Sequence, residues 1–329
     1  MDHIKNRPTF DAPPRKKEVI EAILPEPNML EQMSPWQTNF HQIEPGAMQT
    51  RVKARSGRLL SLLEISMNRS VHQQGSAPPD TLTFGFSLSD GDFRWRGAEM
   101  KKENFLTFGG KDGFEGLTDR AFHGVTFSVA NTDLEILAER LGLPIDDRLR
   151  SSGIFDPAQG PDDIQCLTEK ALKYLKSDGQ IAMDVNDEED MLATFLHLAA
   201  DTSHHKDRCT GHDRTRAVRL ALEFMEENAE HNIPISRICE AANVSLRTLH
   251  RAFHEVCGIG PKAYFLRMRL GLLRRALLNQ DRIGGVSDAA NQLGFWHMGQ
   301  LARDYRAQYG ELPSQTTGGY RLETVAHGS

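Results

Sequence analysis

The sequence predicts an α+β multidomain protein: an N-terminal β-barrel or sandwich with following helices, then an all-α C-terminal domain with two helix-turn-helix units. Two observations carry this prediction. Short alternating apolar segments separated by Gly, Asp, Asn and Pro fill residues 49–130, and a residue pattern near the C-terminus occurs twice at a spacing of 52 residues. The expected boundaries are a flexible arm over 1–35, a first domain over 36–205 with strands to about 130 and helices over 131–203, a linker over 206–213, a second domain over 214–320 and a tail over 321–329.

Composition limits the setting more than the function. The 329 residues are 39% hydrophobic, which is enough to form real cores. No apolar run of about 18 residues and no signal peptide is evident, which predicts a soluble chain that does not enter a membrane. The four cysteines are scattered without metal or disulfide spacing, and this pattern favours the reducing cytoplasm.

The first 35 residues are rich in proline and contain the basic cluster Arg15–Lys17. This composition predicts a mobile arm with one short helix over Val19–Leu24. Two interpretations of the arm stay open: a solvated terminus, or a basic tail that contacts nucleic acid.

Residues 49–130 are predicted to form short strands. The clearest is Thr81–Leu88, where Phe84 and Phe86 alternate with small polar residues and share one face. Strands of this length and spacing are typical of a sandwich or small barrel. The predicted strands cover Leu59–Met67, Thr81–Leu88, Phe93–Trp95, Asn104–Phe108 and His123–Val129.

The strand region also holds the candidates for a small-molecule site. Its aromatic residues can line an apolar pocket or form ordinary core, and the sequence does not separate the two. His123 is either a hydrogen-bonded core histidine or a ligand contact. His72 and His123 lack the clustered His and Glu of a catalytic metal site, so no catalytic residue, metal or cofactor is predicted. The candidate effector-binding residues are Phe84, Phe86, Trp95, Phe108 and His123.

Residues 131–203 change to helical periodicity. Helices are expected over Asp133–Leu141, Pro161–Lys176 and Asp187–Asp201. They pack on the barrel or form a dimer contact, and both interpretations stay open. The next segment, Thr202–Asp213, contains three His and one Cys, but the spacing does not match a zinc motif and the polar run favours a linker.

The repeated pattern starts at Ile235–Phe253, which is typical of a helix-turn-helix unit. Asn243 suits a left-handed turn after a short helix, and Ser245 suits the N-cap of the second helix. Apolar residues of that helix recur at spacings of three and four and therefore face inward. The opposite face presents polar donors that a DNA major groove admits and reads, namely Ser245, Arg247, Thr248, His250 and Arg251.

The second unit, Val286–Tyr305, follows the same plan with Gly294 at its turn. His297 caps a helix less well than Ser or Asp, so this unit is expected to be the less ordered one without DNA. A helix over Pro261–Leu278, about 27 Å long, suits recognition helices about 34 Å apart, one turn of the duplex. The outward residues of the second unit are His297, Met298, Gln300 and Arg303.

Charge is distributed unevenly along a chain whose net charge is −6. Residues 245–310 contain nine Arg, one Lys and four acidic residues, a local charge of +6 that leaves −12 for the remainder. The planar fork of arginine binds phosphate or guanine in a bidentate way. We therefore expect this surface to bind phosphates; the alternative is a solvated helix face.

Residues 215–315 resemble the DNA-binding domain of the AraC/XylS family of transcription regulators. The shared features are Val244-Ser245, Leu249-x-Arg251-x-Phe253, Gly258-x-x-Pro261-x-x-Tyr264, Arg269-Leu270, Ala290-x-x-x-Gly294-Phe295 and Gly310-x-x-Pro313. Cys239 and Asn243 depart from the family, where Ala and Gly are usual. More narrowly, Arg247–His254, Gly258–Pro261 and Gly294–Gln300 resemble the subgroup that includes ethanolamine-utilisation regulators.

The resemblance implies a sequence-specific DNA-binding regulator: a cytoplasmic, effector-responsive activator of a catabolic operon, and not an enzyme. It implies a cupin-like N-terminal barrel that holds a small effector, and the subgroup implies an amine or amino alcohol. The expected partners are double-stranded DNA, the effector, RNA polymerase and a second copy of the chain in a homodimer. The alternative is an enzyme whose catalytic cupin-like barrel is fused to a nucleic-acid-binding domain.

Overall fold

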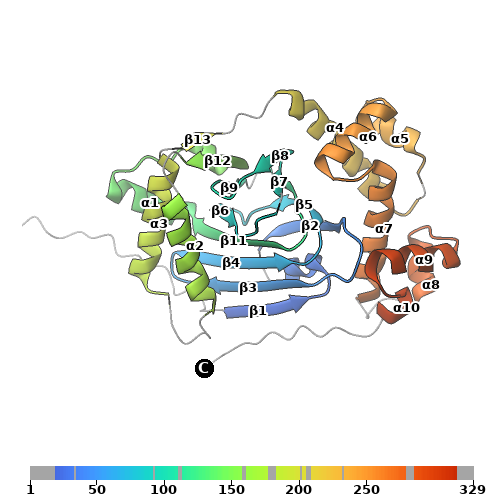
Figure 1. Cartoon of the computed structure of the whole chain (residues 1–329), viewed down its shortest axis with the longest axis horizontal. Coiled ribbons are helices and arrows are strands. Elements are labelled where there is room, and N and C mark those ends of the chain that lie inside the picture. Colours follow the sequence, from blue (N-terminus) through green and yellow to red (C-terminus); the bar gives the residue numbers. More distant parts are fainter. Residues whose placement is uncertain are drawn as a thin grey trace, which may run out of the picture.

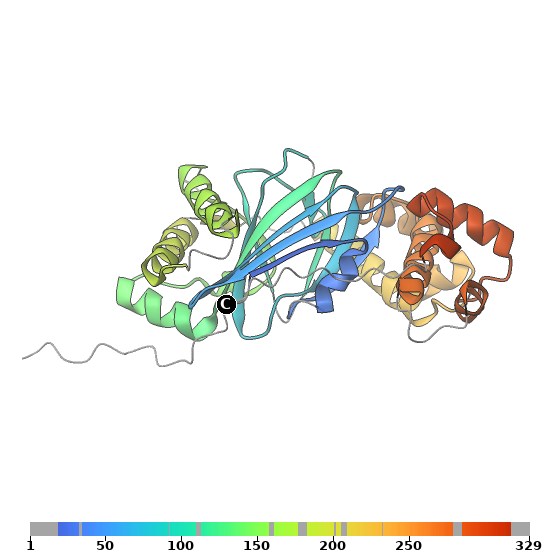
Figure 2. The same ribbon diagram turned by 90° about the horizontal axis from the view of Figure 1, so that it is seen from below.

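The computed structural model describes residues 19–32, 35–91, 93–109, 113–157, 161–176, 183–200, 202–204, 209–231, 233–278 and 285–316. Antiparallel sheets occupy the middle of the molecule, helices cover one end, and a helical domain lies at the other end (Figures 1 and 2). This arrangement confirms the predicted fold class: sandwich-like sheets with following helices, then a helical helix-turn-helix domain.

The strands pair into two antiparallel sheets. They are β1 (Val19–Leu24), β2 (Gln37–Gln42), β3 (Thr50–Ser56), β4 (Leu60–Met67), β5 (Val71–Ser76), β6 (Thr81–Ser87), β7 (Phe93–Trp95), β8 (Ala98–Met100), β9 (Phe105–Phe108), β10 (Phe114–Leu117), β11 (Phe122–Ala130), β12 (Gly153–Pro157) and β13 (Thr202–His204). One sheet has the order β1-β3-β4-β11-β6-β9-β12-β13, and the other has the order β2-β5-β10-β7-β8. Both orders contain non-sequential neighbours, so the chain passes repeatedly between the sheets.

The eight-stranded sheet has an apolar core on each face. On β11, Val125 and Phe127 point toward the helices, whereas Thr126 lies on the side of the second sheet, because successive side chains of a strand alternate. The helix-covered core also contains Phe84, which stacks on Phe127 and Phe195. The second core, between the sheets, contains Trp36, Leu63, Phe93, Trp95 and Phe114 among others.

Three helices cover the outer face of the eight-stranded sheet: α1 (Asn131–Leu141), α2 (Pro161–Lys176) and α3 (Val185–Ala200) (Figure 2). Glu188 anchors α3 to the sheet. Its fully buried carboxylate accepts hydrogen bonds from the backbone N–H groups of Arg58 at 3.0 Å, Leu59 at 2.6 Å and Leu60 at 2.7 Å. These three donors lie at the start of β4, so one acidic side chain satisfies the turn between β3 and β4.

The N-terminal segment differs from the expectation. The short helix predicted over Val19–Leu24 is wrong: these residues form β1, which pairs with β3 and closes one edge of the sheet. A 3-10 helix, η1 (Pro27–Gln32), follows it, and a second, η2 (Asp147–Arg150), precedes β12. Alternating residues of β1 pack into the core between the sheets, and this packing overrides the local composition. The rest of the predicted arm, residues 1–18, lies outside the described residues.

The helical domain contains two apolar cores that share α7. Its helices are α4 (Cys209–Glu227), α5 (Ile235–Ala242), α6 (Leu246–Val256), α7 (Pro261–Leu278), α8 (Val286–Gln292), α9 (Met298–Tyr309) and α10 (Pro313–Thr316). The first half of α7 packs with α4, α5 and α6, and its second half packs with α8 and α9. Within the described ranges, no helix is both long enough and apolar enough to cross a membrane.

Candidate nucleic-acid interface and ligand cavity

The turn of the first unit has the geometry that its residues predict. Asn243 adopts the left-handed conformation with φ 53° and ψ 44° after α5. The backbone N–H groups of Asn243 and Val244 donate to the carbonyls of Glu240 and Cys239, both at 3.1 Å. Ser245 then caps α6, because its Oγ accepts a hydrogen bond from the backbone N–H of Thr248 at 3.2 Å. The turn thereby fixes the direction in which α6 leaves α5.

Helix α6 separates a buried face from an exposed polar face. Leu249 and Phe253 are fully buried and hold the helix against the domain core. The five predicted contact residues Ser245, Arg247, Thr248, His250 and Arg251 are all exposed. Glu255 restrains Arg251 through a 3.0 Å ion pair and also pairs with Arg214 of α4. The exposed face therefore carries several hydrogen-bond donors on a rigid helix, which is what recognition of base edges requires.

The second unit depends on glycine at its turn. Gly294 has φ +66°, and a Cβ there would lie 2.2 Å from the carbonyl oxygen of Glu230, so no other residue fits without a shift. Helix α9 starts after His297 without a side-chain cap, as expected, and α8 also lacks one. His297, Gln300 and Arg303 are exposed. Met298 is half-buried and packs against the second core, so it contributes more to this unit's packing than to its outer face.

Trp296 was not anticipated as a surface feature. It directly precedes α9, and its 75% exposure is the highest among the described large hydrophobic side chains. An aromatic side chain beside a recognition helix can contact sugar rings or the methyl group of thymine. Its position after Gly294 and Phe295 is the sequence signal that could have identified it.

Helix α7 holds the two units in a fixed relation. Arg269 is buried and donates to the carbonyls of Ala229 at 2.9 Å and Leu293, while its guanidinium lies 4.3 Å from the ring centroid of Phe295. Arg274 is buried as well and pairs with Glu311 at 2.6 Å. The expectation that the arginine-rich segment serves phosphates is therefore wrong for these two residues, since they satisfy acceptors inside the domain. In Figure 1, α6 and α9 lie at opposite ends of α7.

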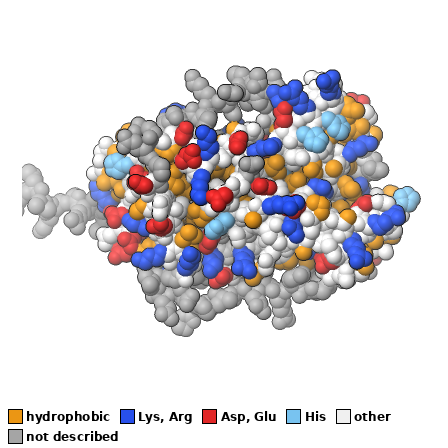
Figure 3. Space-filling model, viewed as in Figure 1, with side chains coloured by type: hydrophobic (Ala, Val, Ile, Leu, Met, Phe, Trp, Pro, Cys, Tyr) orange, Lys and Arg blue, Asp and Glu red, His pale blue; other side chains and the backbone are white. Residues whose placement is uncertain are grey.

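Basic side chains remain accessible over the helical domain. Figure 3 shows Lys and Arg side chains over the elements at its right, with fewer acidic side chains among them than over the sheet. Arg247 and Arg306 are exposed and have no ion-pair partner within the described part of the chain. Free guanidinium groups beside a recognition helix are suited to phosphate contacts that position a protein on the duplex.

A wall of three strands, β2, β5 and β10, joins the helical domain to the sheets. On its outer face, His72 is fully buried and its ring nitrogens lie 2.8 Å from the hydroxyl of Tyr264 on α7 and 2.9 Å from Glu115 Oε1. Elsewhere along the interface, Gln308 Nε2 donates to the carbonyl of Gln42 at 3.0 Å. Arg267 of α7 donates to the carbonyl of Ile43. The docked surface is thus rich in buried polar groups, and several of them are hydrogen-bonded to the other domain.

His41 should make this interface sensitive to acid. Burial, reinforced by the charges of His72 and Arg275, lowers the pKa of His41 to about 3. In the unfolded chain this histidine has its ordinary pKa near 6.5. Below that pH the unfolded chain takes up a proton that the folded chain does not bind, so the free energy of unfolding falls as the pH drops from 6.5 toward 3. We expect a loss of about 2 kcal/mol between about pH 7.5 and about pH 5, measured by urea unfolding.

The matched control for this prediction is His41→Phe, which keeps a ring at the site and removes the titration. Burial raises the pKa of Glu26 and of Glu226, and these carboxyls act in the opposite direction because they must ionise as the pH rises. Subtracting the variant's pH profile isolates the histidine. Profiles of equal slope for the two proteins would contradict the assignment.

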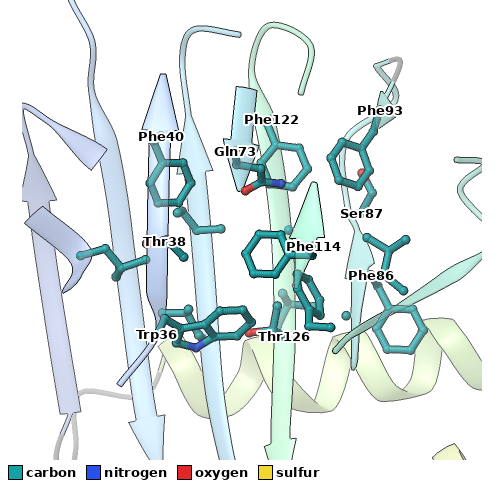
Figure 4. Close-up of a pocket in the computed structure, with 18 residues that line it drawn as sticks. Trp36, Thr38, Phe40, Gln73, Phe86, Ser87, Phe93, Phe114, Phe122 and Thr126 are labelled. Carbon is teal, nitrogen blue, oxygen red and sulfur yellow. The ribbon is translucent and has the colours of Figure 1, made fainter. Parts of the chain in front are cut away.

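A cavity of about 50 Å³ lies between the sheets (Figure 4). Its lining is mostly aromatic and aliphatic, and the polar members are Thr38, Gln73, Ser87 and Thr126. The inner face of the three-strand wall contributes Thr38 and Phe40 from β2, Gln73 from β5 and Phe114 from β10. The same strands thus line the cavity on one side and dock the helical domain on the other.

The structure places the five candidate effector residues in three locations. Phe108 lines the cavity. Trp95 lies in the same inter-sheet core, where it stacks on Phe114 with ring centroids 5.2 Å apart. Phe84 and Phe86 both belong to the helix-covered core, as expected for residues that share one face of β6, and Phe86 also borders the cavity. Trp36 and Gln73 were not predicted as cavity residues, because Trp36 directly precedes β2, Gln73 lies on β5, and the polar composition of both strands gave no apolar alternation.

His123 lies on the outer face of the eight-stranded sheet, away from the cavity. It is half-buried and hydrogen-bonded to Glu64 Oε1 at 2.8 Å, and this contact lowers the pKa of Glu64. The pair borders an open groove of about 400 Å³ that also contains Arg51 and Lys53. Within the described ranges, no group of three potential metal ligands lies together; the side chains of His204, His205, Cys209 and His212 fall outside them.

Comparisons with known proteins match the helical domain. Residues 238–318 match the model of the family described as a helix-turn-helix domain. A probable AraC family transcriptional regulator from Rhodopseudomonas palustris is 35% identical, with 31% of this chain and 94% of that chain covered and a TM-score of 0.29. The XylDLEGF operon transcriptional activator 2 of Pseudomonas putida is 31% identical over 105 residues, which cover 32% of this chain and 67% of the relative. Through this domain, the chain belongs to the AraC family.

For one of the activators, the similarity is confined to part of each protein. The XylDLEGF operon transcriptional activator 1 of Pseudomonas putida is 36% identical over 96 residues, which are 29% of this chain and 29% of the relative. The chain thus spans less than a third of that relative's length. The AraC-family resemblance predicted from the helix-turn-helix residues is confirmed for this domain, and the ethanolamine-regulator subgroup stays a prediction.

Proposed function

We propose that the protein is a sequence-specific DNA-binding transcription regulator that responds to a small effector. The observation that carries the proposal is the pair of exposed donor faces on α6 and α9, held at opposite ends of the single helix α7. Each face presents arginine and neutral donors above a fully packed core, which matches the demands of a major groove. The names of the P. putida relatives, both activators of an operon, favour activation over repression.

The sheet domain would serve as the sensor. The cavity lies on one face of β2, β5 and β10, and α7 packs on the other face. A ligand that displaces these strands would therefore also displace the DNA-binding domain. A catalytic barrel would need a nucleophile with a general base beside it, or a metal-binding group, facing this cavity; the described lining offers hydroxyls but no acidic, basic or imidazole side chain. These features favour a binding role for the barrel. Cytoplasmic location, contact with RNA polymerase and a homodimer remain part of the proposal.

Footprinting of the full-length protein tests the DNA-binding role. Binding sites would first be selected from random duplexes, and the selected duplex would then be mapped with hydroxyl radicals. We expect two protected patches on one face of the DNA, about 34 Å apart, for each bound chain. Protection of a single groove, or equal binding to random and selected duplexes, would contradict the proposal.

A further inference from the structure

The cavity between the sheets lacks any charged group. Within the described part of the chain, none of its lining residues is Asp, Glu, Lys, Arg or His. An ionised ligand would lose its hydration there without gaining a partner, which is strongly unfavourable. The amine predicted from the ethanolamine-regulator resemblance would need a carboxylate. Glu64, the acidic residue of the outer groove, is already paired with His123 and flanked by Arg51 and Lys53.

Two polar groups of the cavity lining have no hydrogen-bond partner within the described part of the chain. One is the amide of Gln73, a residue that is 9% exposed. The other is the hydroxyl of Thr126, which is fully buried. Figure 4 shows both among the aromatic rings of the lining. Because buried polar groups in folded proteins are nearly always paired, an amide that both donates and accepts in this setting is suited to a bound polar group.

The size of the cavity limits what enters it. At about 50 Å³ it has roughly a third of the volume of an engineered apolar cavity, about 150 Å³, that binds benzene. A ring-sized molecule would therefore fit only if lining side chains such as Phe114 and Phe122 turn aside. Gly85 and Gly124 already leave the walls of β6 and β11 without side chains where they border the space.

We propose that this cavity binds an uncharged, largely apolar molecule of about one ring, whose single polar group is held by the amide of Gln73. The inference rests on the proposed function only in naming this molecule as the effector. Entry of the molecule expands the space between the sheets and displaces the wall of β2, β5 and β10. His72 is the neighbour of Gln73 on β5 and points to the other face, where it is hydrogen-bonded to Tyr264 of α7. A movement of β5 at Gln73 therefore also moves this contact with the helical domain.

Four probes of similar size and different charge test the chemical class. Benzyl alcohol, toluene, benzylamine and benzoate would each be titrated into the full-length protein at neutral pH by calorimetry. Tryptophan fluorescence, to which Trp36 of the lining contributes, is a second readout. We expect benzyl alcohol and toluene to bind, and the cationic and anionic probes to bind at least about tenfold more weakly. A charged probe that binds as tightly as benzyl alcohol, or an absence of binding by all four, would overturn the proposal.

Variants on one strand test the role of Gln73. Gln73→Leu should weaken benzyl alcohol by about three- to tenfold and leave toluene unchanged, since only the hydrogen bond is lost. Gln74→Leu is the matched control, because Gln74 lies on the opposite face of β5, where its amide donates to Glu115 at 3.3 Å. Equal effects of the two substitutions on benzyl alcohol would overturn the assignment to Gln73.

The DNA-binding role is tested separately from the cavity. Footprinting without any probe reports on α6 and α9 alone, so the probe series can fail while DNA binding stands. The reverse result, probe binding with random DNA contacts, would contradict the regulator and leave the ligand class intact.

Discussion

Replacing Arg251 and Arg303 together with alanine should weaken binding to the selected operator by about 2–6 kcal/mol. The two residues occupy equivalent positions of the duplicated units, 52 residues apart, and each lies on the exposed face of its recognition helix. A bidentate contact to a base contributes about 1–3 kcal/mol of discrimination. Because each helix would enter its own groove, the effects of the single substitutions should add. Electrophoretic mobility shifts on selected and scrambled duplexes measure the loss.

Two controls separate base recognition from simple charge. Arg251→Lys and Arg303→Lys keep the charge but lose the planar fork, so they should lose specificity and retain affinity for scrambled DNA. Arg140→Ala removes a cation from α1 in the other domain, where it pairs with Glu189, and should not change DNA binding. An equal loss on selected and scrambled duplexes in the double alanine variant would show that both arginines contact only phosphates.

Glu188→Ala should destabilise the N-terminal domain by roughly 3–5 kcal/mol. The substitution leaves the buried backbone N–H groups of residues 58–60 without an acceptor, and each unpaired buried group costs about 1–3 kcal/mol, reduced where water reaches it. The free energy of unfolding from urea titration measures the effect. A lowered midpoint with an unchanged dependence on urea would locate the effect in stability rather than in compactness.

Glu189→Ala is the matched control for Glu188. It removes the same charge from the next residue of α3, but its partner is the surface residue Arg140. Ion pairs at the surface contribute about 0–1 kcal/mol, so this variant should remain close to the wild type. Similar losses in both variants would mean that the helix charge, and not the buried hydrogen bonds, accounts for the result.

The helix-turn-helix units could be predicted from sequence because their determinants are local. Asn243, Ser245 and Gly294 each specify one backbone conformation or one cap, and the structure shows all three in those roles. The apolar period of three and four then gives the buried face of α6 directly. Such elements can be predicted from one sequence because the residues that determine them are close together in the chain and recur with a strict period.

The wall and its cavity could not be predicted in the same way. Residues 71–76 read Val-His-Gln-Gln-Gly-Ser, without the alternation of a half-exposed strand, because the first half of β5 is buried on both faces, by the inter-sheet core and by α7. Polar groups on its outer face are satisfied by Tyr264 and Glu115, which are distant in sequence. The buried roles of Arg269, Arg274 and Glu188 could not be predicted for the same reason. Each charged side chain is buried because its hydrogen-bond partners come from residues that are distant in sequence.

The double use of α7 has a mechanical consequence. The helix spans 18 residues, about 27 Å. It contacts the sheet domain through Tyr264 and Arg267 in its first half, and Gln308 of α9 ties the second unit to Gln42. A tilt of α7 by about 10° would displace one of its ends by about 5 Å relative to the other, close to half the roughly 12 Å width of a major groove. A small shift of the sheet domain under α7 can therefore prevent α6 and α9 from entering two major grooves at the same time, although neither helix-turn-helix unit changes its own structure.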